Sequence, residues 1–420
     1  MTRRRTLYDD GSFGFFLWKV LSVVAVIVAV GFFIHARLNP APVDETVPPD
    51  NIVIDDPDNV NPDQTIDVDD DPDPDDHQAK PVEPVMHTFY YQHLDDTGKA
   101  VYDEILAASK NFQTTIKLKT LAPFSTVGSA VQAFCCDYPL YYWTCHAYTY
   151  YLNTNKEVTS LVFEYKGTER TNVEQLEAIS DEIVSAMPQG LSDVEKLRYL
   201  HDHIVMTVEY YDNSDPVNQE AVSALINQSS VCAGYARAFQ LLCQKAGIPC
   251  TYVYGNDHQY DGTSGRHAWN FVQLDDKYYW MDVTWDDTLV TEENGVDTPC
   301  YYYFLDGEEI FFIQHEYDMP DLTFSYPYLP KCTDTSLEYF VTRNSYFETY
   351  NRADVSTVMQ NYKNDRVVEI RFANHGELEK AIDDLFTNKN IWTLFEENGI
   401  SVDTYFWYKF DSISALKILY

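Results

Sequence analysis

The chain has 420 residues, of which 45% are hydrophobic, and it contains 33 tyrosines and 23 phenylalanines. This much apolar and aromatic material is enough for a large packed core, which excludes a chain that is disordered throughout. The formal net charge of −37 excludes a nucleic-acid-binding role, because such proteins present a basic surface to the phosphates.

The first 36 residues have the pattern of a membrane anchor. Three consecutive arginines in residues 1–12 precede an apolar segment over residues 13–36, and residues 20–34 carry no charge. The segment is long enough for a bilayer if Lys19 extends to the headgroups. Positive charge before the span predicts a cytoplasmic tail and a single-pass signal anchor in the plasma membrane, with the globular part outside. A cleaved signal peptide is the alternative, because it shares the basic start.

Residues 37–86 are dominated by aspartate and proline, with almost no aromatic side chains. This composition predicts a disordered, self-repelling linker. A calcium loop is an alternative for the run DVDDDPDPDD, but the run lacks the glycine and the glutamate that an EF-hand needs. We expect a solvated spacer here, and no bound metal.

The cysteine pattern gives no sign of a metal or cofactor site. An extracytoplasmic location permits disulfides, but no C-x-x-C spacing indicates zinc or redox chemistry, so we expect neither metal nor cofactor. The eight cysteines are Cys135, Cys136, Cys145, Cys232, Cys243, Cys250, Cys300 and Cys332.

The folded region begins near residue 87 with helix-like and strand-like patterns. Residues 93–112 have apolar side chains at helical spacing, whereas the aromatic segments 134–154 and 157–165 are typical of strands. Two predicted helices follow, each opened by a capping box in which Ser or Thr precedes Glu by three residues. The boxes are Thr171 with Glu174 and Ser192 with Glu195.

The segment SSVCAGYARAF, residues 229–239, predicts a helix that begins beside a cysteine. Ser230 is a natural N-cap, which places Cys232 in the first turn, and Gly247 followed by Pro249 ends the helix. A helix N-terminus lowers the pKa of a thiol and makes it nucleophilic. The alternative is a thiol buried for packing.

Residues 266–285 predict a β-hairpin around the turn Asp275-Asp276. With a two-residue turn, Leu274 faces Lys277, and Asp282 then lies diagonal to His267 on the same face. Diagonal neighbours are about 7–8 Å apart at the backbone, which an imidazole and a carboxylate can bridge. A slip of one residue would place the two side chains on opposite faces.

These three residues form a candidate catalytic triad. A nucleophilic cysteine needs an adjacent base and a third group that orients the base, which Cys232, His267 and Asp282 would supply. The alternative is a buried thiol, a core histidine and a surface carboxylate. Trp269 and Trp285 flank the triad and are candidates for the substrate cleft, with packing as their alternative role.

Two stretches, VCAGYARAFQLLCQKAGIPC and HAWNFVQLDDKYYWMDVTWDD, resemble the transglutaminase-like superfamily. The resemblance implies an α+β fold with a papain-like core, in which the cysteine opens a helix packed on an antiparallel sheet that carries the histidine and the aspartate. It also implies the roles: Cys232 is nucleophile and backbone N–H donor to the oxyanion, His267 is general base and acid, and Asp282 orients His267. DYPLYYW and YYYFLDGEE resemble flanking pieces of bacterial, membrane-anchored surface members.

The expected domain plan follows from these patterns. Residues 87–190 form an N-terminal α/β flanking region, residues 191–320 the transglutaminase-like catalytic core, and residues 321–420 a small C-terminal α/β subdomain with strands around one or two helices. The expected activity is attack on amide bonds of proteins or cell-wall peptides through an acyl-enzyme. Water as acceptor would give a peptidase or amidase, and an amine would give a transglutaminase. A catalytically silent binding or structural module at the cell surface is the alternative.

Overall fold

The computed structural model describes residues 89–420, apart from 146, 166, 213–214, 259–262, 289–290, 294–295 and 318–328. The predicted tail, anchor and linker lie outside the described residues. Within the described part of the chain, none of the helices has the length and apolar character needed to cross a bilayer.

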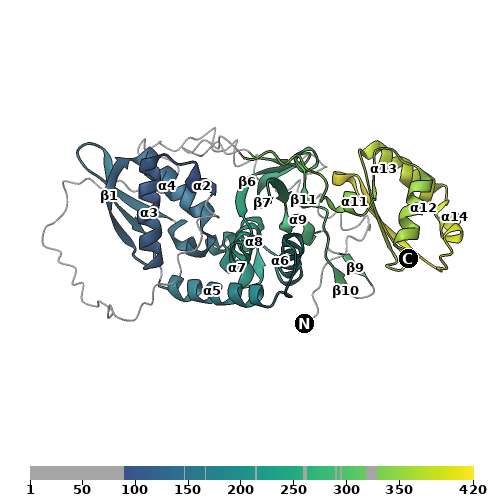
Figure 1. Ribbon diagram of the computed structural model, residues 1–420, viewed down its shortest axis with the longest axis horizontal. Coiled ribbons are helices and arrows are strands. Elements are labelled where there is room, and N and C mark those ends of the chain that lie inside the picture. Colours follow the sequence, from purple (N-terminus) through teal and green to yellow (C-terminus); the bar gives the residue numbers. More distant parts are fainter. Residues whose placement is uncertain are drawn as a thin grey trace, which may run out of the picture. The chain divides into compact units, whose positions relative to one another are not determined.

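The first described elements are three helices and a three-stranded antiparallel sheet in the order β1-β3-β2 (Figure 1). They are α2 (Phe89–Gln92), α3 (Asp96–Lys110), β1 (Thr115–Pro123), α4 (Phe124–Asp137), η3 (Pro139–Cys145), β2 (Tyr148–Leu152) and β3 (Glu157–Phe163). The helix predicted over residues 93–112 is confirmed, and β3 confirms the strand predicted over residues 157–165.

The strand predicted over residues 134–154 is wrong in its first half. Residues 134–137 end α4, and Pro139 opens the 3-10 helix η3. In α4 the side chains of Val127, Val131 and Phe134 recur at helical spacing and are buried. The aromatic residues of this stretch favour strands, but burial along one helical face is the stronger influence.

In the middle of the chain, several helices pack against α8 (Cys232–Ala246) (Figure 1). These are α5 (Glu169–Ser185), α6 (Asp193–Thr207), η4 (Pro216–Gln219) and α7 (Ala221–Leu225). The capping box of Ser192 and Glu195 is confirmed at the start of α6. The box of Thr171 and Glu174 is wrong, because α5 begins at Glu169, one residue after Thr168.

A five-stranded antiparallel sheet in the order β11-β8-β7-β6-β12 lies against α8. Its strands are β6 (Cys250–His258), β7 (Ser264–Leu274), β8 (Lys277–Met281), β11 (Phe304–Asp306) and β12 (His315–Glu316). Leu274 pairs with Lys277 and Asn270 pairs with Met281, so the predicted hairpin register is confirmed. The short elements near this sheet are β4 (Glu209–Tyr210), β5 (Ser229–Ser230), α9 (Val283–Thr288), β9 (Thr291–Glu293), β10 (Val296–Thr298) and α10 (Glu308–Phe311).

The C-terminal residues form a four-stranded sheet in the order β13-β14-β16-β15, with helices packed on β14. Its elements are α11 (Tyr339–Thr342), β13 (Tyr346–Phe347), α12 (Arg352–Asn361), β14 (Val367–Phe372), α13 (His375–Ile382), η5 (Asp383–Thr387), α14 (Ile391–Glu397), β15 (Phe406–Phe410), η6 (Asp411–Ile413) and β16 (Ala415–Leu419). The mixed α/β content is as predicted, but the helices exceed the expected one or two. Phe340, Ile413 and Ala415 pack with Trp269 and Phe311, so this region is continuous with the core behind β7.

Candidate active site

Cys232 is the first residue of α8, and the helix ends before Gly247, which has the left-handed conformation that the sequence predicts for it. The predicted N-cap is wrong. Val231 occupies that position without a side-chain cap, and the Ser230 hydroxyl instead donates to the Asn218 carbonyl at 2.9 Å. The first-turn N–H groups of α8 therefore have no side-chain cap, and such groups attract negative charge on a thiol or an oxyanion.

Gly234 allows the segment before α8 to approach the first turn of α8 closely. A Cβ at this position would lie 1.9 Å from the Ser230 hydroxyl oxygen and 2.9 Å from the Glu220 carbonyl oxygen. Any other residue would push η4 and α7 away from the first turn of α8. The glycine of the VCAGYA motif is thus required by packing beside the thiol.

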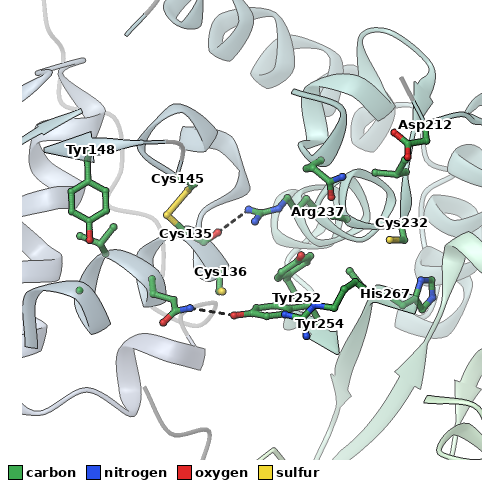
Figure 2. Close-up of a pocket in the computed structure, with 18 of the residues that line it drawn as sticks. Cys135, Cys136, Cys145, Tyr148, Asp212, Cys232, Arg237, Tyr252, Tyr254 and His267 are labelled. Carbon is green, nitrogen blue, oxygen red and sulfur yellow. Dashed lines mark hydrogen bonds between the residues drawn. A yellow bond between two sulfur atoms is a disulfide. The ribbon is translucent and has the colours of Figure 1, made fainter. Parts of the chain in front are cut away.

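His267 lies on β7 and is 6% exposed. Its Nε2 lies 2.6 Å from Oδ2 of Asp282, and Cys232 is close enough to contribute to the pKa of the ring. Because Nε2 is hydrogen-bonded to the Asp282 carboxylate, Nδ1 is the ring nitrogen available to the thiol. Figure 2 shows Cys232 and His267 together on one side of a shared cavity. The fold therefore brings the three predicted residues together: His267 contacts Asp282 and lines one cavity with Cys232.

Asp282 follows β8 directly and accepts three hydrogen bonds. Oδ2 accepts from His267 and also lies 2.9 Å from Nε2 of a second histidine, His315. Oδ1 accepts from the Trp285 backbone N–H at 3.0 Å. The hairpin register explains the contact with His267. Met281 pairs with Asn270, so Asp282, the next residue, lies opposite Trp269 and diagonal to His267.

Asp282 and His267 each stabilise the charged form of the other. Burial opposes the protonated ring of His267, but the charge and hydrogen bond of Asp282, with a contribution from Cys232, raise the pKa of His267 to about 10. Burial opposes the ionised form of Asp282 as well, yet the two imidazoles hold its pKa well below the usual range. The Asp282 carboxylate therefore favours the protonated form of the His267 ring at neutral pH.

A cavity of about 690 Å³ opens beside Cys232 and His267. Its far wall is formed by α4 and η3, which a disulfide between Cys135 and Cys145 joins (Figure 2). Arg237 lies between the two walls and donates to the Cys135 carbonyl at 3.0 Å. The cavity is thus large enough for several atoms of a peptide beside the thiol.

Arg237 is part of a buried ion pair. Its Nε lies 3.5 Å from Oε2 of Glu220, and its guanidinium carbon lies 4.5 Å from the centre of the Tyr252 ring. Burial raises the pKa of Glu220 to about 7, although the charge of Arg237 opposes this. The pair joins α8 to the segment that precedes it.

A second cavity, of about 360 Å³, lies on the other side of His267. His267 and Arg266 line both cavities, whereas Cys232 lines the larger one. Trp285 lines the second cavity, as a cleft residue would. Trp269 is 1% exposed and lines neither cavity, so its position is that of a core residue behind the sheet.

Among the described residues, two groups have the composition of metal ligands. Ligand atoms of His267, Asp282 and His315 lie within 4.8 Å of one another, but here the two rings are hydrogen-bonded to the carboxylate. His375, Glu379 and Asp411 form the other group, and the Lys409 ammonium lies 3.1 Å from Glu379 and 2.9 Å from Asp411. The Lys409 cation thus already pairs with both carboxylates of the second group.

His315 is the site residue that sequence reasoning missed. It lies on β12, whose pairing with β6 places His315 opposite Asp257, a residue far away in the sequence. No local spacing links it to Asp282, because the contact depends on that long-range pairing.

The family comparison agrees with the position of these residues. Residues 177–284 match the model of the transglutaminase-like superfamily, and this range contains Cys232, His267 and Asp282. Kyphoscoliosis peptidase of Mus musculus is 26% identical over 167 residues, which cover 37% of this chain and 25% of that protein. Its Homo sapiens counterpart is 29% identical over 149 residues, which cover 32% and 22%. The chain thus matches about a quarter of the length of these relatives.

Among solved structures, one from Cytophaga hutchinsonii, provisionally assigned as a cysteine protease, is 15% identical. The match covers 34% of this chain and 55% of that one, with a TM-score of 0.23, which is too low to support a conclusion. The match to the family model stands without it: this chain contains a domain of the transglutaminase-like superfamily over residues 177–284.

Proposed function

We propose that the protein is a thiol enzyme that acts on amide bonds through an acyl-enzyme, with Cys232 as nucleophile. The observation that carries the proposal is the position of His267, which lines one cavity with Cys232 and lies 2.6 Å from Asp282 through its Nε2. A protonated imidazole beside a thiol at an uncapped helix start is an environment that favours a reactive thiolate.

The reaction would proceed in two halves. The Cys232 thiolate attacks an amide carbonyl, and the backbone N–H of Cys232 donates to the oxyanion. The Nδ1 proton of His267 then passes to the leaving amine, and the C–N bond breaks to leave a thioester. In the second half, His267 takes a proton from water or an incoming amine, which attacks the thioester, and the thiolate leaves.

The substrate class proposed from the sequence is a protein or a cell-wall peptide. The larger cavity supports a peptide-sized acyl group, because it opens directly beside the thiol. The name of the relatives, a peptidase, agrees with amide-bond chemistry. We also propose that residues 13–36 anchor the protein in the plasma membrane, with the enzyme outside, on the basis of the apolar segment after three arginines.

The first experiment measures the reactivity of Cys232 in the full chain. Iodoacetamide at pH 6 should modify Cys232 much faster than it modifies a model thiol, as judged by mass spectrometry of the labelled peptide. The buried Cys243 provides an internal comparison, because burial and its neighbour Cys250 raise its pKa. Equal rates for Cys232 and a model thiol would contradict the proposal and would favour the silent binding module.

The second experiment identifies the acceptor. The full chain is incubated with a library of peptides and a fluorescent primary amine, and products are separated by mass. Amine incorporation identifies a transglutaminase, and cleavage without incorporation identifies a peptidase or amidase. Cys232→Ala is the matched control, and activity that survives in it would contradict the role of the thiol.

A further inference from the structure

We propose that His315 is a positioning residue of the active site, which donates from Nε2 to Asp282 and thereby fixes the carboxylate that orients His267. The inference rests on the proposed function of Cys232, His267 and Asp282. His315 touches neither the thiol nor a substrate, so its effect passes through Asp282.

The geometry places one carboxylate oxygen between two imidazoles. Oδ2 of Asp282 lies 2.6 Å from Nε2 of His267 and 2.9 Å from Nε2 of His315. The side chains of His315 and Asp282 are fully buried. Because these side chains are fully buried, the orientation of the carboxylate depends on the two rings and on the Trp285 N–H.

The ring of His315 faces an acceptor at each nitrogen. Nδ1 lies 3.0 Å from the Phe311 carbonyl oxygen, which can only accept. Burial, together with the charge of His267, lowers the pKa of His315, so the ring holds one proton at neutral pH. One proton can serve one acceptor, and the ionised carboxylate is the stronger of the two. The proton therefore lies on Nε2, directed at Asp282.

The fold holds the His315 ring firmly in this position. The ring stacks on Phe311 with ring centres 3.8 Å apart and an angle of 14° between the planes, and it lies 4.4 Å from the ring centre of Trp285. On the backbone side, β12 pairs with β6, which places His315 opposite Asp257. A ring held on both faces can act as a fixed donor, which is what orientation of a carboxylate requires.

Several titratable groups surround His315 and have to be followed in any pH titration. They come from five different elements or junctions: His267 on β7, Asp282 after β8, Tyr303 before β11, Asp257 on β6, and Glu316, which follows His315 on β12.

The test compares two variants that both remove the imidazole ring of residue 315 but differ in the length of the side chain that carries the amide. In His315→Gln, the amide nitrogen lies near the place of Nε2 and can still donate to Asp282. In His315→Asn, the amide lies near the place of Nδ1 and can reach only the Phe311 carbonyl. Both lose the stacked ring, so a packing role alone predicts equal behaviour, which thermal unfolding checks.

Three quantities are measured on the full chain. They are the rate of Cys232 alkylation between pH 5 and 9, the melting temperature, and the proton resonance of the short His267–Asp282 hydrogen bond in protein with ¹⁵N-labelled histidine. We expect His315→Gln to keep the resonance and an alkylation rate close to that of the wild type. His315→Asn should lose the resonance and react about 10-fold to 100-fold more slowly at equal melting temperature, as expected for one lost hydrogen bond to a charged group.

Equal rates and equal resonances in the two variants would overturn the proposal. The labelled wild-type chain gives an independent answer if a variant does not fold. A proton on Nε2 of His315 at neutral pH supports the proposal, and a proton on Nδ1 alone overturns it. A slow wild-type thiol would count against the proposed function, whereas the position of the His315 proton is decided separately.

Discussion

Gly255 and His267 lie opposite each other in the antiparallel pair of β6 and β7. A Cβ on Gly255 would lie 2.2 Å from the Glu316 carbonyl oxygen and 2.8 Å from the Trp269 ring. The missing side chain therefore lets β12 approach β6 beside His267. This close approach is what brings His315 onto Asp282.

We expect Gly255→Ala to displace β12 and to lower the free energy of unfolding by about 1–3 kcal/mol, as overpacking in a core does. Alkylation of Cys232 should slow as well, because His315 moves with β12. Urea unfolding and alkylation rates measure the two effects. Gly265→Ala on β7 is the control for stability, since its Cβ would meet only a side-chain oxygen of Asp257, at 3.3 Å. Equal losses in both variants would contradict the close-approach argument.

Asp282→Asn should remove the charge that keeps His267 protonated, and burial should then lower the pKa of His267 from about 10. A histidine whose pKa is raised on folding stabilises the protein fully below pH 6.5, and this stabilisation is lost as the pH rises toward 10. The wild type should therefore lose more stability than Asp282→Asn over that range. Melting temperatures at pH 6, 8 and 10 measure the difference.

Asp286→Asn is the matched control for this titration. Asp286 lies 3.0 Å from the buried His201, and although burial opposes it, the hydrogen bonds of Asp202 and Asp286 raise the pKa of His201 to about 9. This variant should remove the His201 contribution and leave the titration of His267 in place. Identical pH profiles for the two variants would show that the two histidines cannot be assigned in this way.

Arg237→Met should leave Glu220 buried without its cation and should cost about 3–5 kcal/mol of unfolding free energy at pH 8. The loss should be smaller at pH 5.5. The pKa of Glu220 is already about 7 beside the cation, so without it the carboxyl is protonated and uncharged in the folded state at that pH. Urea unfolding at the two pH values measures this.

The double variant Glu220→Gln with Arg237→Met tests whether the cost comes from the unpaired charge. It should recover most of the stability that Arg237→Met loses at pH 8, and the recovery should be smaller at pH 5.5, where the single variant loses less. A double variant as unstable as Arg237→Met alone would indicate that packing of the Arg237 stem on Tyr252, rather than charge, sets the cost.

Gly234→Ala should destabilise the protein and slow the alkylation of Cys232, because the new Cβ would displace Ser230 and the Glu220 carbonyl from the first turn of α8. A loss of about 1–3 kcal/mol is expected from overpacking. Gly128→Ala in α4 is the helical control. Its Cβ would make an ordinary 3.6 Å contact with Phe124, so the change should stabilise by up to about 1 kcal/mol. A stabilised Gly234→Ala would contradict the argument.

Local signals were enough to predict the parts of the site that lie close in the sequence. Gly247 ends α8 where expected, and the two-residue turn sets the register that joins His267 to Asp282. The N-cap prediction at Ser230 failed because its hydroxyl is bonded to the Asn218 carbonyl and to Ser223, at 2.5 Å. A capping residue can be bound elsewhere when another segment packs against it, and the sequence does not show that competition.

The sequence by itself determined that Cys232 lies at the start of a helix and that His267 and Asp282 lie on one hairpin in a fixed register, because helix ends and hairpin turns depend on a few neighbouring residues. Tertiary structure alone decided that His315 shares Asp282 and that the disulfide of Cys135 and Cys145 lines the same cavity as Cys232. These contacts join distant segments, and they form only when burial of apolar surface brings sheet edges and helices together.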